Sequence, residues 1–295
     1  MRWADNFIAV DWGTTNRRAY RIDQSGACDA TFEDDCGIMS VAAGEFPAAA
    51  QAIRERLGDL PLLLAGMVGS NRGWVEVPYV RCPATLDDLV GAVRLVDDGR
   101  GAIIPGLSVE GSGKADVMRG EEVQVFGALE SKAIPPTCLV GHPGTHNKWV
   151  SVEDGRILGF RTVMTGEMFN LLRANGILAV LLTGEAVPGE PFSDGVRCSL
   201  AGGPLTADLF SARARVLLGD MAGVDASSYV SGLLIGADIG LSRTLATEAE
   251  TIIMGRPDLT RLYAAAAIEA GMAAREIDGS SAFVAGAVAI ARKLA

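Results

Sequence analysis

The segment with the clearest chemical signal is a glycine turn that follows the first apolar run of the chain. Its groups that could contact a phosphate or a metal ion belong to Asp11, Gly13, Thr14, Thr15 and Arg18. Glycine allows a tight turn whose N–H groups face an anion, and the hydroxyls and the arginine add donors. The Asp11 carboxylate can hold a water of a bound Mg²⁺ ion. The pattern therefore predicts a phosphate and magnesium site, although a hairpin turn capped by Asp11 would need the same residue types.

A second glycine turn lies between two expected strands near the middle of the chain. It supplies Gly144, Thr145 and Lys148, and two such hairpins can together hold a polyphosphate. His142 and His146 lie in the same turn, four residues apart, which on a helix would suggest a metal pair. A proline and a glycine between them interrupt any helix and no third ligand follows, so no zinc site is predicted.

A loop-rich stretch, residues 66–84, has the composition of a substrate loop. Glycine and proline punctuate it, and its aromatic and cationic residues are Arg72, Trp74, Tyr79 and Arg81. The alternative is that the arginines are merely solvated and that the rings pack the loop down. A later stretch, residues 106–114, ends in Gly-Lys but lacks the spacing and the Ser or Thr of a P-loop, so a mobile loop is predicted there.

Strand and helix signals alternate along the whole chain, which predicts an α/β protein. In the first half we expect a three-stranded antiparallel meander, a helix over 45–57, a buried strand over 60–67 and a helix that begins near Arg119. The second half begins with a similar hairpin and then becomes helical. The helices expected there lie near 166–182, 192–201, 205–218, 225–235 and 281–294.

Length and repetition predict two domains. A chain of 295 residues is long for one core, and the hairpin-first pattern occurs twice. We expect an N-terminal domain over residues 1–132, with the first phosphate hairpin and the substrate loop. A C-terminal domain over residues 133–295 would carry the second hairpin, with the final helix able to pack back on the first domain.

The composition argues against several classes of protein. A net charge of −10 and a pI near 4.8 disfavour a nucleic-acid partner. No run of about 18 apolar residues and no export signal is visible, so a cytoplasmic protein without a membrane partner is predicted. Five scattered cysteines fit reduced thiols in that compartment. Oligomeric state cannot be read from these patterns.

The two hairpins and a later glycine-plus-helix element resemble the sugar kinase, heat-shock chaperone and actin ATPase superfamily. More closely, the motifs GMVGSNRGWVEVPYVRCPA, DVMRGEEVQ, HPGTHNKWV, TVMTGEMF and LLIGADI look like those of the 2-dehydro-3-deoxygalactonokinase family. These motifs span almost the entire chain. The resemblance implies two ribonuclease H-like domains of the actin and hexokinase type, with a cleft for nucleotide and substrate between them.

The resemblance also implies an activity. Members of this family transfer the γ-phosphoryl group of ATP, with Mg²⁺, to the 6-hydroxyl of 2-dehydro-3-deoxy-D-galactonate in galactonate catabolism. Another sugar or sugar acid is an open alternative, because stereochemistry at C4 cannot be read from the sequence. An actin-like or chaperone-like protein that uses ATP to drive a partner interaction is the alternative from another class.

The resemblance assigns further residues. Related kinases take their catalytic base from an acidic residue that opens a helix at the domain junction, which favours Glu121, with Asp116 as the rival. The alternative is that Glu121 is only an acidic residue of the first helical turn, where the helix dipole favours it. The substrate's carboxylate would meet the arginines of the substrate loop. Gly255 and Arg256 fall at the place of the adenosine element, where a strand ends and a helix begins, although a plain turn before a helix has the same features.

Overall fold

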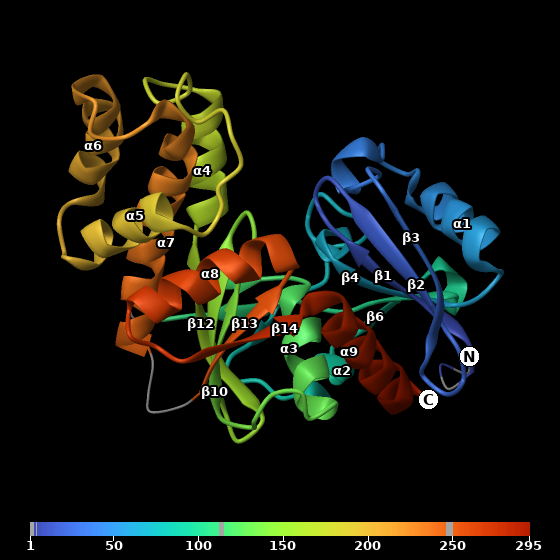
Figure 1. Ribbon diagram of the computed structural model, residues 1–295. Helices are drawn as coiled ribbons and strands as arrows, with labels where there is room; N and C mark the ends of the chain where they lie inside the picture. The colour runs from blue at the N-terminus through green and yellow to red at the C-terminus, as the bar shows by residue number, and fades with distance from the viewer. Residues whose placement is uncertain (1–2, 4, 112–114, 246–249) are drawn as a thin grey trace. The chain divides into compact units, whose positions relative to one another are not determined.

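The computed structural model describes residues 3, 5–111, 115–245 and 250–295, and these residues form two compact units (Figure 1). Unit 1 comprises Met1–Pro136, Val152–Phe160 and Gly279–Ala295. Unit 2 comprises Thr137–Ser151 and Arg161–Asp278. The N-terminal segment of unit 1 therefore ends at residue 136, four residues after the expected domain boundary at residue 132. The last helix belongs to unit 1. Part of the glycine-lysine stretch, residues 112–114, lies outside the described residues.

Unit 1 is built on a six-stranded sheet in the order β3-β2-β1-β4-β7-β6. Its strands are β1 (Phe7–Trp12), β2 (Arg17–Ile22), β3 (Cys28–Asp34), β4 (Leu62–Gly66), β6 (Arg94–Val96) and β7 (Gly101–Ile103). β1, β2 and β3 form the expected antiparallel meander, while β1, β4 and β7 run parallel. The continuous apolar runs of β1 and β4 suit central strands that are covered on both faces.

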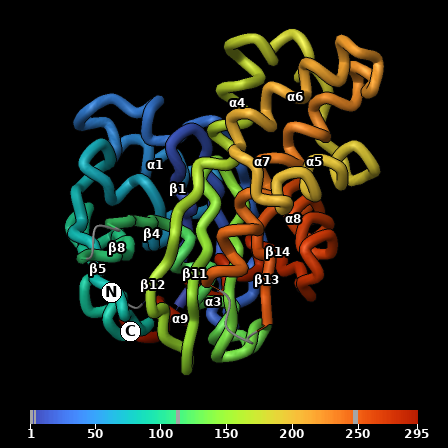
Figure 2. The backbone as a smooth tube through the Cα atoms, turned by 90° about the vertical axis from the view of Figure 1, so that its left-hand side faces the viewer, coloured from blue at the N-terminus to red at the C-terminus, as the bar shows by residue number. Residues whose placement is uncertain are grey.

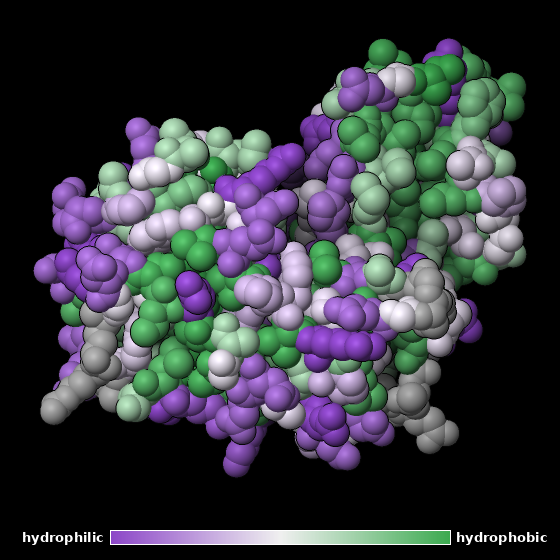
Figure 3. All heavy atoms as spheres, turned by 180° about the vertical axis from the view of Figure 1, so that it is seen from behind, coloured by the Kyte–Doolittle hydropathy of each residue, from purple (hydrophilic) through white to green (hydrophobic). Residues whose placement is uncertain are grey.

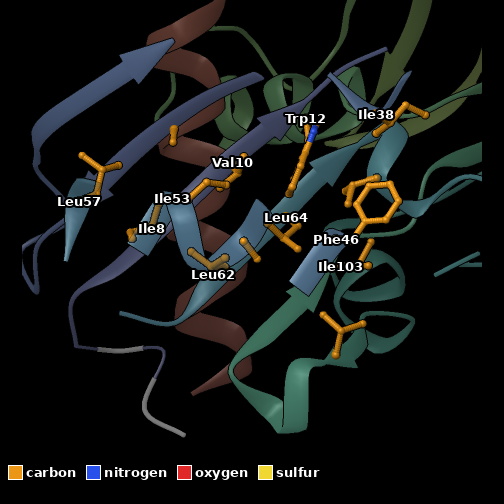
Figure 4. Packing of buried hydrophobic residues seen from close by; sticks show 14 of the residues in the cluster. Ile8, Val10, Trp12, Ile38, Phe46, Ile53, Leu57, Leu62, Leu64 and Ile103 are labelled. Atoms are coloured by element: carbon orange, nitrogen blue, oxygen red, sulfur yellow. The ribbon is translucent and has the colours of Figure 1, made fainter. Parts of the chain in front are cut away.

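Two helices cover opposite faces of this sheet. Ile8, Val10 and Trp12 alternate along β1 and pack with helix α1 (Phe46–Leu57) in one core cluster (Figure 4). Tyr20 points to the other face, where its ring lies 5.5 Å from that of Phe283 in α9 (Gly279–Leu294). The C-terminal helix therefore completes the core of unit 1.

Helix α9 packs closely against α3 (Glu121–Glu130) at two glycines. A Cβ atom added to Gly127 would lie 2.0 Å from the Ala282 carbonyl oxygen, and one added to Gly286 would lie 2.0 Å from the Val123 carbonyl oxygen. Only glycine permits this approach. The remaining elements of unit 1 are α2 (Leu86–Gly91) and a small sheet of β5 (Val80–Arg81), β8 (Leu107–Val109) and β9 (Asp116–Met118).

The second sheet has five strands in the order β12-β11-β10-β13-β14, and Figure 2 shows it from one side. It belongs mainly to unit 2, but residues 152–160, where β11 ends and β12 begins, group with unit 1. Its strands are β10 (Cys138–His142), β11 (Asn147–Glu153), β12 (Arg156–Val163), β13 (Glu250–Gly255) and β14 (Ala274–Asp278). β13 runs parallel to both of its neighbours, β10 and β14. Helices α5 (Glu190–Leu200), α7 (Ala226–Leu245) and α8 (Pro257–Glu269) pack on this sheet through one apolar cluster.

The helical part of unit 2 differs from expectation in two places. Helix α4 covers only Thr165–Ala174, and the predicted extension to residue 182 is wrong because Asn175 is extended and Gly176 has a φ of 84°. Helix α7 runs ten residues beyond the expected end. Helix α6 (Leu205–Leu218) leaves Phe210, Leu217 and Leu218 exposed. Figure 3, which is seen from behind, shows that apolar and polar residues alternate over that face of the molecule.

No helix in the described part of the chain is long and apolar enough to cross a membrane.

Candidate active site

The first glycine turn is held in shape by its own backbone and by the segment after β3. The N–H of Gly13 donates to the Asn16 carbonyl oxygen at 2.9 Å, so it is used inside the turn. The carbonyl oxygens of Thr14 and Thr15 accept hydrogen bonds from Met39 and Gly37. Both threonines are exposed. The Thr15 hydroxyl donates to Asn16 Oδ1 at 2.7 Å. The turn therefore presents two exposed threonines on a hydrogen-bonded backbone, which suits a phosphate site.

Asp11 pairs across the hairpin with Arg18. The guanidinium of Arg18 lies 3.1 Å from the Glu33 carboxylate, so its charge is partly engaged within the sheet. Burial raises the pKa of Asp11 to about 6, while the positive charge of Arg18 lowers it and the negative charge of Glu121 raises it. The influence of Glu121 shows that two of the predicted catalytic carboxylates share one electrostatic environment.

Two glycines make room for the Asp11 carboxyl group. Gly66 ends β4 and Gly120 precedes α3, and both have positive φ, 89° and 112°. A Cβ atom on Gly66 would lie 2.8 Å from the Trp12 carbonyl oxygen, and one on Gly120 would lie 3.8 Å from Asp11 Oδ1. The carboxyl ends of β1 and β4 and the N-terminus of α3 therefore meet around Asp11.

Helix α3 begins with two acidic residues of different character. The Glu121 carboxylate accepts a hydrogen bond from the Arg119 backbone N–H at 3.1 Å and is half-buried. Glu122 is fully buried, and both of its oxygens lie 2.8 Å from the Gly120 nitrogen. Burial and the charge of Glu121 raise the pKa of Glu122 to about 8, against the Gly120 hydrogen bond. Only Glu121 is therefore placed to reach a ligand.

Asp116 lies on another element, the edge strand β9, where its carboxylate accepts a hydrogen bond from the Val117 N–H at 2.9 Å. It is partly exposed.

The substrate loop divides into two parts. Arg72 and Trp74 line an open hollow of about 540 Å³ together with Phe46 and Pro47 of α1, and the Trp74 and Phe46 rings are stacked 6.4 Å apart. Tyr79 and Arg81 do not line this hollow. Arg81 is exposed and lies 3.6 Å from the Glu110 carboxylate. The four residues predicted to bind substrate therefore do not form a single cluster.

Arg119, which the sequence analysis did not select, lies between the substrate loop and α3. It is 8% exposed, its Nη2 donates to the Val77 carbonyl oxygen at 2.8 Å, and its guanidinium lies 4.3 Å above the Tyr79 ring. Among the described residues, its Nε and Nη1 atoms have no hydrogen-bond partner. A buried guanidinium with unused donors is costly, which marks it as a candidate functional group. Its position directly before the helix-start glycine was the available sequence signal.

The second glycine turn is fastened to helix α4. The Thr145 carbonyl oxygen accepts a hydrogen bond from the Glu167 N–H at 2.8 Å, and the His146 ring pairs with the Glu167 carboxylate. Thr145 is exposed, whereas Lys148 is buried and its ammonium group lies 3.2 Å from the His146 carbonyl oxygen. Thr145 and Gly144 are therefore open to a ligand, and Lys148 supports the turn from within.

The predicted adenosine element adjoins this turn within unit 2. β10 and β13 are parallel neighbours, so their carboxyl ends meet, and a Cβ atom on Gly255 would lie 3.5 Å from the Pro143 carbonyl oxygen. Arg256 precedes α8 and pairs with the Asp258 carboxylate at 2.7 Å, with both side chains exposed. One edge of the unit 2 sheet thus carries both predicted nucleotide elements.

The donor set was tested for a metal. Among the described residues, no group of three or more His, Cys, Asp or Glu side chains could hold an ion by itself. A single accessible carboxylate such as Asp11 fits a Mg²⁺ ion that is held mainly by water and by the phosphates of a nucleotide, since such ions keep most of their hydration shell.

Comparison with known proteins gives consistent matches along the chain. The family model for 2-keto-3-deoxy-galactonokinase matches residues 11–290. The chain is 35% identical over 293 residues to the 2-dehydro-3-deoxygalactonokinase of Escherichia coli (strain K12), covering 98% of each sequence. A solved structure from Sinorhizobium meliloti, assigned to the same activity, has a TM-score of 0.87 at 32% identity and covers 98% of this chain and 99% of its own.

A more distant solved structure concerns the fold alone. Component A of (R)-2-hydroxyglutaryl-CoA dehydratase from Acidaminococcus fermentans is 13% identical, with a TM-score of 0.56, and covers 98% of this chain and 99% of its own. The predicted fold class, two α/β units of the actin-like ATPase type, is confirmed by these structural matches.

Proposed function

Because the chain belongs to the 2-keto-3-deoxy-galactonokinase family, we propose that it transfers the γ-phosphoryl group of ATP to the 6-hydroxyl of 2-dehydro-3-deoxy-D-galactonate. The match over 98% of the chain to a relative named 2-dehydro-3-deoxygalactonokinase carries this proposal. The product, a 6-phosphate, belongs to galactonate catabolism. ATP as the phosphoryl donor supports a cytoplasmic location.

Glu121 is the proposed catalytic base. Its carboxylate is half-buried at the start of α3 and shares an electrostatic environment with Asp11. It accepts the proton of the 6-hydroxyl as the oxygen forms its bond to the γ-phosphorus. The bond between the γ-phosphorus and the bridging oxygen breaks, and ADP leaves with that electron pair. Asp116, on β9, is the rival base.

Asp11 is proposed to hold Mg²⁺ through a water molecule. The bound ion would neutralise charge that develops on the phosphate oxygens. Asp11 must be ionised for this role, and its pKa of about 6 makes the ionised form predominant at neutral pH. A phosphate-binding role is proposed for each glycine turn by itself. In unit 1 it is assigned to Thr14 and Thr15, with Gly13 providing the tight turn, and in unit 2 to Gly144 and Thr145.

Supporting roles complete the nucleotide site. Arg18 and Lys148 are proposed to contribute positive charge near the phosphates, although the first pairs with Glu33 and the second is buried. Gly255 and Arg256 are proposed to contact the adenosine, from the sheet edge that also carries the second turn.

The sugar acid is assigned to unit 1. Arg72 and Trp74 line the hollow beside α1, while Tyr79 and Arg81 extend the loop beyond it. Arg119 is added to this set because two of its donors are unpartnered and its ring contact is with Tyr79. A carboxylate is the ligand group that best satisfies such donors.

The test is sugar-acid-dependent formation of ADP. Purified protein is assayed with MgATP alone and with 2-dehydro-3-deoxygalactonate, 2-dehydro-3-deoxygluconate or a neutral sugar. We expect ADP only when a sugar acid is present, with the galactonate derivative giving the highest kcat/KM. ADP formation at the same rate without any acceptor would instead support an ATP-operated binding protein.

A further inference from the structure

A buried carboxylate in unit 2 joins four elements, and the sequence analysis assigned it no role. Asp238 lies in helix α7 and is 1% exposed. Its Oδ1 accepts a hydrogen bond from Trp149 Nε1 at 2.6 Å, and its Oδ2 accepts hydrogen bonds from the Thr165 and Tyr263 hydroxyls, each at 2.6 Å. The Asn147 side-chain amide lies 3.1 Å from both oxygens. Every donor comes from unit 2.

These donors belong to the elements that border the predicted nucleotide edge. Asn147 directly follows the second glycine turn. Thr165 is the first residue of α4, whose first turn donates to the Thr145 carbonyl oxygen through the Glu167 N–H. Tyr263 lies on α8, the helix that begins immediately after Gly255 and Arg256. The Asp238 carboxylate therefore fixes three elements relative to one another: the second glycine turn, helix α4 and helix α8.

The number of donors argues against a residue that merely fills the core. Burying a carboxylate costs free energy because a charge loses its hydration. An apolar side chain would fill the same volume without that cost. Burial raises the pKa of Asp238, and hydrogen bonds from its four donor residues oppose that rise. Four side-chain donors that bind one buried carboxylate are held in one geometry.

We propose that Asp238 is a positioning residue for the nucleotide, which it serves by holding the turn at residues 143–146 in register with α8. It does not touch ATP. This proposal rests on the proposed function, because it takes that edge of unit 2 as the nucleotide site. The sugar-acid residues lie in unit 1, so Asp238 affects nucleotide affinity and leaves sugar-acid affinity unchanged.

The experiment compares Asp238→Ala and Asp238→Asn with the matched control Ser242→Ala. Ser242 lies one turn further along α7, is fully buried and donates to the Ile239 carbonyl oxygen at 2.8 Å, so its loss weakens the same helix without touching the phosphate turn. Isothermal titration with a non-hydrolysable ATP analogue and Mg²⁺ gives the Kd, and steady-state assays give the KM of each substrate. Unfolding temperatures report the structural cost of each variant.

We expect Asp238→Ala to raise the Kd for the analogue about tenfold or more, with the sugar-acid KM within about twofold of wild type. Asp238→Asn should recover part of this loss, since its amide oxygen can still accept from Trp149 and Asn147 while the two hydroxyls can reverse their hydrogen bonds. Ser242→Ala should lower the unfolding temperature without changing the Kd.

If Asp238→Ala does not fold, Tyr263→Phe removes one donor and should raise the Kd roughly two- to fivefold. Equal nucleotide affinity in wild type, Asp238→Ala or Tyr263→Phe, and Ser242→Ala would overturn the proposal, as would a parallel rise in both KM values. Wild-type protein that binds the analogue but forms no sugar phosphate would contradict the proposed function alone. Wild-type protein that does not bind the analogue would overturn both.

Discussion

The polar centres of the two units are satisfied to different degrees. In unit 2, four side-chain donors surround the Asp238 carboxylate. In unit 1, Arg119 keeps two donors without a partner among the described residues, and burial raises the pKa of Asp11 to about 6 and that of Glu122 to about 8. Groups that titrate near neutrality or lack partners are found where a site handles protons and charge.

We expect the two polar centres to have different roles. Four side-chain donors on the Asp238 carboxylate fix the geometry of their elements, so loss of that carboxylate should change how well a ligand is held. An unsaturated cluster leaves charges and protons available, so its loss should change the chemical step or the recognition of an ionic substrate. The variants below test whether unit 1 carries the chemistry and the sugar acid, beginning with the largest expected effect.

The most severe loss is expected at Asp11. Asp11→Ala should reduce kcat to below about one-thousandth of wild type while leaving the unfolding temperature nearly unchanged, because its proposed partner is the magnesium shell. Wild-type kcat should also rise as the pH passes about 6, where Asp11 becomes ionised. Asp29→Ala, which removes an exposed carboxylate of the same sheet, is the control. Near-native turnover of Asp11→Ala would show that phosphoryl transfer does not need the Asp11 carboxylate.

The next effect concerns the base. Glu121→Gln keeps the shape and the acceptor for the Arg119 N–H but removes basicity, so the single-turnover rate of phosphoryl transfer should fall roughly 10²–10⁴-fold at saturating substrates. Asp116→Asn should have a smaller effect. A dead Asp116→Asn beside a fully active Glu121→Gln would reverse this ranking, and two active variants would exclude both residues.

Arg119→Lys should have a selective effect on sugar-acid binding. Lysine keeps the charge but loses the contact with Val77 and the flat stacking on Tyr79, so the sugar-acid KM should rise about tenfold with the ATP KM unchanged. Arg54→Lys is the matched control, because Arg54 is equally buried in unit 1 but is paired with Asp97 at 2.7 Å. Equal KM changes in the two variants would reduce Arg119 to a structural residue.

The smallest effects are expected in the exposed part of the loop. Arg72→Ala should raise the sugar-acid KM a few-fold, because Arg72 lines the hollow beside α1. Arg81→Ala should change it by less, because the exposed Arg81 faces Glu110 across 3.6 Å and such pairs contribute little. Steady-state kinetics with both substrates varied would measure the difference. A larger effect at Arg81, or a rise in the ATP KM, would contradict this assignment.

The local parts of the site could be predicted from sequence. The two glycine turns lie between strands whose apolar runs were visible, so their position followed from neighbouring residues alone. The start of α3 was predicted for the same reason. The short strands β5, β8 and β9 were missed because two or three residues carry no periodicity.

The roles of Arg119 and Asp238 could not be predicted because both depend on distant partners. The Arg119 side chain meets Val77, 42 residues earlier, and Asp238 binds Asn147, 91 residues earlier. In the sequence, Asp238 is one of two charged residues in a long, largely apolar helix. Its burial and its partners arise only when α7 packs against β11, α4 and α8, which no local pattern encodes.

Helix α9 packs on unit 1 although it follows unit 2 in the sequence, so the core of unit 1 cannot be completed until unit 2 has been synthesised. Unit 1 begins first, yet Phe283, which covers Tyr20, belongs to the final helix. All residues of unit 2 have been translated by Asp278, before α9 exists. The usual sequence, in which the N-terminal domain folds first on the ribosome, is therefore inverted for the finished structure. A stalled or C-terminally trimmed chain would leave one face of the first sheet uncovered, although every strand of that sheet had been made.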